Sequence, residues 1–294
     1  MLSVLDLRGF EGDLRSALPR PPLAGVAVVE TVRGLLAAVR AEGDAALRRF
    51  TKQFDGCEVD DLRVPADQVA GALALVDGDL RGALAFAYEQ IKAYHEAQIR
   101  PAIVHSREGI SVRDLSRPVE RAGVYVPGGR AIYPSTVLMC AVPARVAGVG
   151  EVVLCVPPGP DGAVPLPTLA AAALAGVDEV YRVGGAQANP ALANGTESIR
   201  AVDMIVGPGN VYVTVAKREV AGVVGIEATA GPSELVIVAD GSAVPDWIAI
   251  DLMAQAEHGP DGSAVLVTPS PELIDGVEAS LARLVSESER LAEI

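Results

Sequence analysis

A glutamine and a histidine near the end of the sequence have residue types and a spacing that suit metal binding. In DLMAQAEHGPDGSAVLV (251–267), Asp251, Gln255 and His258 stand at i, i+4 and i+7, which places them on one face of a helix. A catalytic zinc takes three protein ligands and keeps an open position. Glu257 would point about 100° away from His258, which excludes it as a shared ligand. On spacing alone a polar helix end is the simpler interpretation, because the helix dipole favours a histidine there.

The helix that must position these side chains is predicted over residues 246–258. Ile248 and Leu252 recur at a spacing of four and form its buried stripe. Gly259 and Pro260 end it, because glycine suits the residue after a helix and proline cannot continue one. Predicted strands precede and follow this helix, so the candidate ligands belong to a strand–helix–strand unit.

Glycine-rich turns form a second group of candidate binding elements. YVPGGRAIYPS (125–135), VGGAQA (183–188) and VGPGNVYV (206–213) each follow a predicted strand and open a helix. Such turns bring backbone N–H groups close to a ligand, and the carboxyl ends of parallel strands are where α/β sheets bind ligands. None is a GxGxxG, so each alone fits an ordinary turn, while the three together favour a nucleotide or another anionic ligand. In AGPSE (230–234), Ser233 either contacts a substrate or caps a turn.

The composition narrows the class of protein. The 294 residues suggest about two domains, and a hydrophobic content of 50% with only 4% aromatics suits an α/β protein built from small apolar residues. With 24 Lys and Arg against 38 Asp and Glu, the net charge of −14 disfavours nucleic acid and anionic membranes as partners. No apolar run reaches the roughly 18 residues of a membrane span, and the N-terminus lacks a signal-peptide pattern. We expect a soluble, cytoplasmic protein.

The cysteines indicate no disulfide framework. Cys57, Cys140 and Cys155 are odd in number and include no CxxC motif. Cys140 and Cys155 lie in apolar stretches, which favours small buried hydrophobes over nucleophiles.

The periodicity changes along the chain from helical to alternating. Residues 1–25 are predicted to form an arm, an apolar period of three or four over 28–54 predicts one helix, and further helices are predicted over 65–76 and 79–99. The stretch 109–126 predicts a pair of strands. From there strands alternate with helices of about ten residues, which predicts βαβ units and a parallel sheet. The expected fold class is α/β with a mainly helical N-terminal region.

Taken together, the motifs point to a known family. GVYVPGG, YPSTVLM, ARVAGV, VGGAQA, GPGN, AGPSE and QAEHGPD follow one another in this order, and from about Phe54 to the end the chain closely resembles histidinol dehydrogenase. The resemblance implies oxidation of L-histidinol to L-histidine through L-histidinal, in two NAD-dependent steps that end histidine biosynthesis. It also implies a homodimer whose small terminal segments exchange between subunits.

The resemblance implies two Rossmann-like domains with parallel sheets, one inserted into the other. On this sequence, the arm is 1–25, the discontinuous first domain is 26–124 with 235–294, and the inserted NAD-binding domain is 125–234.

The resemblance also assigns individual residues. The residues that match the family's NAD contacts are Tyr125, Gln187 and Asn210. Ser233 matches a substrate contact, and Gln255 and His258 match two of four zinc ligands that also touch substrate. The zinc implied there orients the substrate as a template.

The chain departs from the family pattern in its length. Family members run about half as long again, and the additional part carries a Glu–His acid–base pair in a GPEHL-like stretch, with the other two zinc ligands. No PEH occurs in this sequence, so residues 1–294 hold no catalytic residue by this resemblance. Glu227 stands where aspartate is expected. We therefore expect a C-terminally truncated enzyme that is inactive alone.

Two alternatives stay open at this stage. One is a dehydrogenase of another small alcohol within the same family. The other is a non-catalytic nucleotide-binding remnant, which would hold zinc poorly because Gln255 and His258 supply at most half of its ligands.

Overall fold

The structure is a computed structural model that describes residues 2–18, 25–128, 131–229, 233–258 and 262–288. Its contacts divide the chain into two compact units, Val26–Gly231 and a smaller unit of Met1–Gly25 with Pro232–Ile294. The expected α/β fold with parallel sheets is confirmed in both units. Within the described ranges, none of the helices combines the length and the apolar character that a membrane crossing requires.

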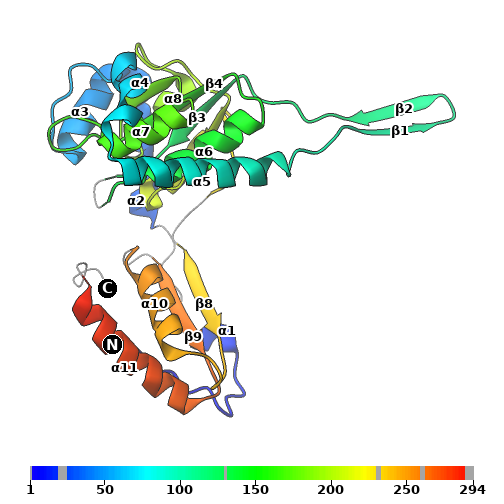
Figure 1. Cartoon of the computed structure of the whole chain (residues 1–294), viewed down its shortest axis with the longest axis vertical. Helices are drawn as coiled ribbons and strands as arrows, with labels where there is room; N and C mark the ends of the chain where they lie inside the picture. The colour runs from blue at the N-terminus through cyan, green and yellow to red at the C-terminus, as the bar shows by residue number, and fades with distance from the viewer. Residues whose placement is uncertain (1, 19–24, 129–130, 230–232, 259–261, 289–294) are drawn as a thin grey trace. The chain divides into compact units, whose positions relative to one another are not determined.

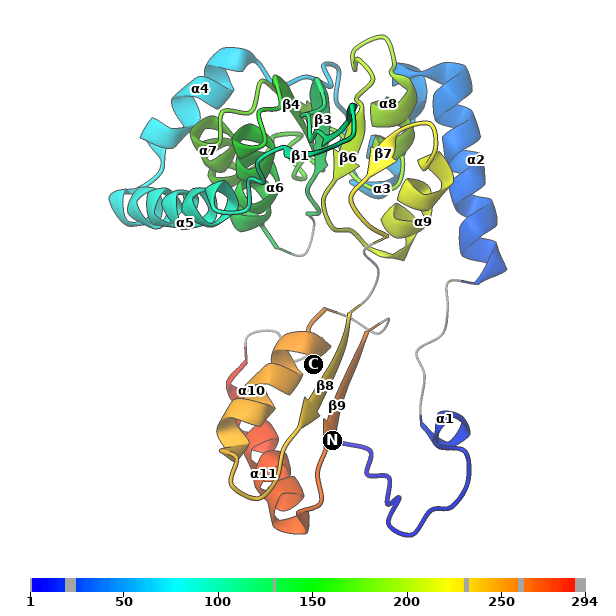
Figure 2. The same cartoon turned by 90° about the vertical axis from the view of Figure 1, so that its right-hand side faces the viewer.

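The larger unit is built on a parallel sheet with the strand order β5-β4-β3-β6-β7 (Figures 1 and 2). Its strands are β3 (Arg121–Tyr125), β4 (Glu151–Val156), β5 (Glu179–Arg182), β6 (Met204–Val206) and β7 (Gly225–Ile226). The chain proceeds outward from β3 to β5 and then returns to place β6 on the other side of β3. At such a reversal of strand order, the carboxyl ends of the strands open a crevice that can take a ligand.

Helices cover both faces of this sheet, as Figure 2 shows. The helices on one face are α2 (Val26–Glu42), α3 (Asp44–Phe54), α8 (Ala188–Asn194) and α9 (Val211–Val220). Those on the other face are α4 (Ala66–Leu75), α5 (Gly78–Glu96), α6 (Pro134–Val146) and α7 (Leu166–Leu174). Strand β4 explains why both faces are filled: Val153 and Cys155 join the first cluster, whereas Val152 and Leu154 join the second.

The helical period over residues 28–54 corresponds to two helices, α2 and α3, and not to one. Gly43 separates them with a φ of 56°, a left-handed conformation that glycine adopts without strain. The backbone N–H of Asp44 donates to Oε2 of Glu197 at 2.8 Å, so a distant carboxylate caps the second helix. Periodicity alone does not show this break, because the apolar spacing continues across it.

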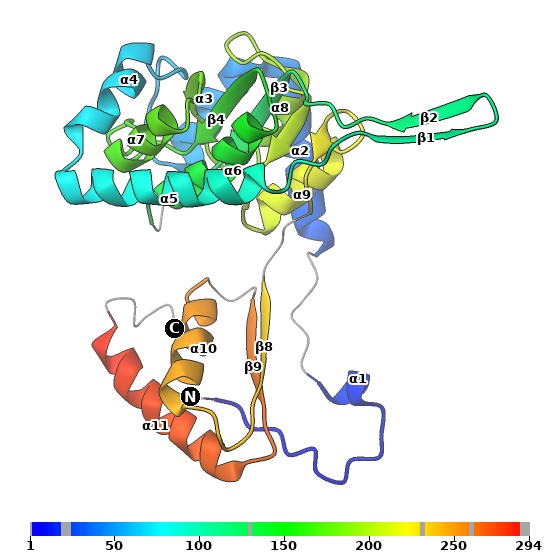
Figure 3. The ribbon, with the colours of Figure 1, turned by 45° about the vertical axis from the view of Figure 1, so that its right-hand side comes forward.

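The strands expected over 109–126 exist, but they do not pair with each other. β2 (Ile110–Asp114) pairs antiparallel with β1 (Ile103–Arg107), and the two form a hairpin that projects from the larger unit (Figures 1 and 3). Glu108 and Gly109 both have positive φ at its turn, as a tight two-residue hairpin turn requires. The second expected strand is β3, whose fully buried residues pair in the parallel sheet instead.

The smaller unit contains one strand–helix–strand–helix sequence. β8 (Glu234–Val238) and β9 (Ser263–Val267) are parallel, and α10 (Pro245–Ala256) and α11 (Pro271–Glu287) pack over one face. Its core is formed by Ile248, Ala249, Leu252, Leu273 and Val277. The short α1 (Leu14–Ala17) belongs to the same unit.

The opposite face of this two-stranded sheet is apolar and exposed. Val236 is 59% exposed and Val238 is 79% exposed, whereas the alternate residue Ile237 packs against the helices. Parallel sheets are normally covered on both faces. No described residue of this unit covers these valines.

The contacts group residues 26–124 with 125–231 in one compact unit, because α2 to α5 bury their apolar faces against the five-stranded sheet. The division expected from the family, with a discontinuous first domain (26–124 with 235–294) and an inserted domain (125–234), stays a prediction.

The exposed valines generate a stability prediction. We expect Val236→Thr and Val238→Thr to change the free energy of unfolding of the smaller unit by less than about 0.5 kcal/mol, because threonine has the same shape and its hydroxyl stays in water. Val277→Thr, in the same unit but fully buried, is the matched control and should cost about 1–3 kcal/mol. Urea unfolding followed by the fluorescence of the chain's one tryptophan, Trp247 in α10, measures all three; equal losses would contradict the assignment of an open face.

Candidate functional site

The turns after three neighbouring strands meet around Pro157, which directly follows β4. A Cβ atom added to Gly128, after β3, would lie 2.6 Å from Cγ of Pro157. A Cβ atom added to Gly184, after β5, would lie 2.5 Å from Cβ of Pro157. Glycine is therefore required at both positions, and the three turns form one continuous surface at the carboxyl edge of the sheet.

Tyr125 and Gln187, both predicted cofactor contacts, lie against the same glycine. The backbone N–H of Gly185 donates to the Tyr125 hydroxyl at 3.0 Å. Gly185 has a φ of 65°, and a Cβ atom there would lie 2.7 Å from Oε1 of Gln187. Burial raises the pKa of Tyr125 above its ordinary value, so the hydroxyl keeps its proton. Because its oxygen accepts from Gly185, that proton can be donated to a ligand.

The amide of Gln187 has no protein partner in the described part of the chain. The side chain is 1% exposed, and neither Oε1 nor Nε2 makes a hydrogen bond. A buried polar group without a partner costs roughly 1–3 kcal/mol, so this arrangement does not serve stability. A nucleotide carries both donors and acceptors, and the residues present therefore fit the NAD that the resemblance implies.

The turn after β6 is held by an ion pair between a buried lysine and a solvent-exposed glutamate. Nζ of Lys217, 1% exposed, donates to the carbonyl of Gly207 at 3.0 Å and to both carboxylate oxygens of Glu227 at 2.6 and 2.7 Å. The same carboxylate accepts the N–H of Gly207 at 2.7 Å. A Cβ atom on Gly207 would lie 2.0 Å from the carbonyl oxygen of Tyr125. The ion pair thus holds both the N–H and the carbonyl of Gly207, the glycine of this turn that lies against the end of β3.

Asn210 lies four residues beyond β6 and caps α9. Its Oδ1 accepts from the backbone N–H groups of Tyr212 and Val213, each at 3.1 Å. The side chain is exposed, so the structure shows it as a helix cap at the end of the clamped turn.

The candidate metal ligands meet in the smaller unit. Nε2 of Gln255 donates to the carbonyl oxygen of Ser233 at 2.8 Å, which turns Oε1 toward His258. Nδ1 of His258 then lies 3.4 Å from that Oε1. Gln255 is buried, whereas the side chains of Ser233 and His258 are exposed. α10 ends at Ala256, close to the predicted end; the expected stop at Gly259 and Pro260 lies outside the described residues.

The donor atoms present fit part of a zinc site. Ligand atoms about 2.05 Å from a tetrahedral zinc lie roughly 3.3 Å from one another, close to the separation of Nδ1 and Oε1. Asp251, on the same face, is exposed one turn away. The described residues contain no group of three or more His, Cys, Asp or Glu side chains that could hold a metal. Gln255 and His258 therefore place two candidate ligand atoms side by side, one of them oriented by the Ser233 carbonyl.

Comparisons with known proteins decide the family. The family model for histidinol dehydrogenase matches residues 19–294. The chain is 49% identical to a histidinol dehydrogenase of Pseudomonas syringae pv. syringae over 269 residues, which is 90% of this chain and 60% of the relative. It is 52% identical to one of Parasynechococcus marenigrum, over 87% of this chain and 59% of the relative. The chain belongs to the histidinol dehydrogenase family.

A solved structure supports the same assignment. The crystal structure of histidinol dehydrogenase from Elizabethkingia anophelis superposes with a TM-score of 0.85 at 36% identity and covers 93% of this chain and 64% of that chain. The present chain thus spans about 60% of the length of the histidinol dehydrogenases it matches.

The thiols of this chain are not activated as nucleophiles. All three cysteines are free; Cys57 and Cys155 are buried, and Cys140 is half-buried. Burial raises the pKa of Cys140 and of Cys155 to about 12, and it also raises that of Cys57. The sequence-based interpretation of Cys140 and Cys155 as small apolar residues agrees with this environment.

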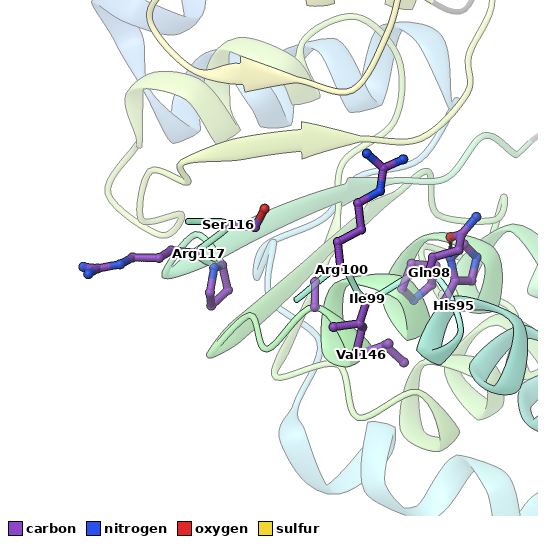
Figure 4. A pocket seen from close by; sticks show the side chains of 10 residues that line it. His95, Gln98, Ile99, Arg100, Ser116, Arg117 and Val146 are labelled. Carbon is purple, nitrogen blue, oxygen red and sulfur yellow. Dashed lines mark hydrogen bonds between the residues drawn. The ribbon is translucent and has the colours of Figure 1, made fainter. Parts of the chain in front are cut away.

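A pocket of about 370 Å³ lies elsewhere, where the β1–β2 hairpin leaves the larger unit (Figure 4). It is lined by residues that include His95, Arg100, Ser116, Arg117 and Val146. Nδ1 of His95 lies 2.7 Å from Oε1 of Gln98. None of the family-matched site residues lines this pocket.

Sequence reasoning assigned no role to three charged groups at the carboxyl edge of the five-stranded sheet. Glu227 was noted only as standing where aspartate is expected, and Lys217 was not predicted, although a lysine inside the otherwise apolar run VYVTVAK was a signal of a buried, paired cation. Asp55, the residue after α3, was not singled out by any sequence pattern, yet its Oδ2 is buried without a partner among the described residues.

The close approach at Gly207 leads to a stability prediction, with a control substitution that should change the free energy of unfolding in the opposite direction. We expect Gly207→Ala to lower the free energy of unfolding by more than about 2 kcal/mol, because its φ of 120° and the nearby Tyr125 carbonyl both exclude a Cβ atom. Gly71→Ala, inside α4 with open space around it, should raise stability by about 0.5–1 kcal/mol. Urea unfolding followed by far-ultraviolet circular dichroism measures both; a neutral Gly207→Ala would contradict the close approach.

Proposed function

We propose that this chain is the part of a histidinol dehydrogenase that binds NAD and supplies two of the four zinc ligands. The whole enzyme would oxidise L-histidinol to L-histidine through L-histidinal, the last step of histidine biosynthesis. The observation that carries the proposal is the buried, unpartnered amide of Gln187 beside the Gly184–Gly185 turn, in a chain of this family.

In this proposal Tyr125, Gln187 and Asn210 contact NAD. The Gln187 amide supplies one donor and one acceptor, and the Tyr125 hydroxyl donates its proton while Gly185 holds its oxygen. The clamp of Lys217 and Glu227 keeps Asn210 at the end of a fixed turn. NAD supplies the hydride acceptor when bound.

The smaller unit would contribute to substrate and metal binding. Gln255 and His258 would hold zinc, and the Ser233 carbonyl keeps the amide oxygen of Gln255 directed toward His258. The side chain of Ser233 is exposed and can contact the substrate. A bound zinc would orient the imidazole and amine groups of histidinol as a template.

The acid–base chemistry of the family has no counterpart in this chain. The sequence contains no PEH motif, and its other histidines, His95 and His105, lie in α5 and in the hairpin. We propose that proton transfer depends on residues present only in longer family members, which would function as cytoplasmic homodimers. The 294-residue chain would then bind NAD without oxidising histidinol.

NAD binding tests the proposal directly. We expect the purified chain to bind NAD in isothermal titration calorimetry and Gln187→Ala to weaken binding at least about tenfold, since a satisfied hydrogen bond is lost on each amide atom. Gln90→Ala, on α5, is the control and should bind as the unaltered chain does. No NADH should form on addition of histidinol and zinc. Failure to bind NAD, or NADH formation by this chain alone, would contradict the proposal.

Zinc binding tests the second half of the site. We expect one weak zinc site per chain, which His258→Asn weakens at least about tenfold because an imidazole ligand is lost. His105→Asn, an equally exposed histidine in the hairpin, should leave the affinity unchanged. Competition with a chromogenic zinc chelator gives both affinities, and equal values for the two variants would rule out His258 as a ligand.

A further inference from the structure

Asp55 places a carboxyl group at the carboxyl edge of the five-stranded sheet, where it has no evident structural role. Asp55 directly follows α3, and its backbone N–H donates to the carbonyl oxygen of Thr51. Its Oδ2 is buried and makes no hydrogen bond in the described structure. A Cβ atom on Gly184 would lie 3.2 Å from its Oδ1, so the carboxyl lies directly over the first glycine of the turn after β5.

The Asp55 carboxyl lies beside the carboxyl edge of the five-stranded sheet. Gly184 also lies against Pro157, the first residue after β4, and Gly185 beside it contacts both Tyr125 and Gln187. Asp55 therefore lies, from outside the sheet, over the turn after β5, and the first glycine of that turn also lies against the residue that follows β4. In dinucleotide-binding folds, an acidic side chain near the glycine-rich turns binds a ribose hydroxyl.

No acidic residue of β4 itself can fill that role here. The strand is followed by Pro157, Pro158, Gly159 and Pro160. The next carboxyl, on Asp161, accepts the N–H of Ala163 at 3.0 Å and so organises its own loop.

The surroundings of Asp55 offer its charge no compensation. Burial raises its pKa to about 6, and no cation contributes to that pKa. Its electrostatic neighbours are the hydroxyl of Tyr125 and the thiol of Cys57, both neutral. A partly buried, unpaired carboxyl costs stability. Gln187, beside the same pair of glycines, has the same deficit, so two polar groups without partners converge on one turn.

We propose that Asp55 is a further cofactor-binding residue, whose carboxyl accepts a hydroxyl of a ribose of the dinucleotide and disfavours a 2′-phosphate at that position. This inference rests on the proposed function, since it requires that the larger unit binds NAD. It makes Asp55 a determinant of selectivity between NAD and NADP, because a carboxylate accepts from a hydroxyl and repels a phosphate.

The test compares NAD and NADP binding to the 294-residue chain by isothermal titration calorimetry. Asp55→Ala should weaken NAD binding about tenfold or more. Asp55→Asn, which keeps the shape, should lower the ratio of NADP to NAD dissociation constants at least about fivefold. Asp60→Asn removes an exposed carboxyl five residues later and should change neither value.

Stability without ligand separates a binding role from a structural one. Both Asp55 variants should unfold at the same urea concentration as the unaltered chain or at a higher one, because an unpaired carboxyl is removed. Unchanged NAD affinity in both variants, with the unaltered chain binding NAD, would overturn the role of Asp55 and leave the proposed function standing. No NAD binding by the unaltered chain would overturn both. Weakened binding together with a large loss of stability would assign Asp55 a structural role and so also overturn the inference.

Discussion

The close approach of Gly207 to the carbonyl of Tyr125 is the contact on which the arrangement of the larger unit depends. It joins β3 to the returning chain at the point where the strand order reverses. A side chain of any size at Gly207 would separate these two ends and move the turn that leads to Asn210. Lys217 and Glu227 hold both peptide groups of that glycine, so a buried lysine and its carboxylate partner stabilise backbone geometry that apolar packing alone does not specify.

The carboxyl edge of the five-stranded sheet differs from the core in how its polar groups are satisfied. The core on both faces of the sheet consists mainly of Val, Leu, Ile and Ala side chains that pack against one another. At the carboxyl edge, by contrast, the amide of Gln187 and Oδ2 of Asp55 are buried without a hydrogen-bond partner among the described residues. The apolar layers supply the free energy that allows such groups to persist where a ligand can complete them.

Sequence reasoning predicted the alternation of strands and helices well, because β4 and α7 are dense in Val, Leu and Ala and are bounded by glycine or proline. It failed where tertiary contacts override local pattern. The break at Gly43 depends on Glu197, more than a hundred residues away, and β2 pairs backward with a strand whose exposed residues carry no clear signal.

For the candidate site, too, prediction succeeded where local motifs carry the information and failed where tertiary contacts do. Family motifs identified Tyr125 and Gln187, which the structure brings to one glycine, and Gln255 and His258, whose ligand atoms face each other. Neither periodicity nor motif indicated Asp55, because its importance arises only when the turn after α3 meets the turn after β5. Nor could spacing show that the Ser233 carbonyl, and not its hydroxyl, orients the amide of Gln255.

The open valine face of β8 and β9 has a consequence for how such a polypeptide emerges from the ribosome. The larger unit has layers on both faces of its sheet and can close its core as soon as residue 231 is released. The strands that follow carry Val236, Val238 and Val267 on a face that no described residue of the smaller unit covers. While this face is exposed, the nascent chain presents valine side chains on two parallel strands, and chaperones that shield exposed aliphatic surface would bind there.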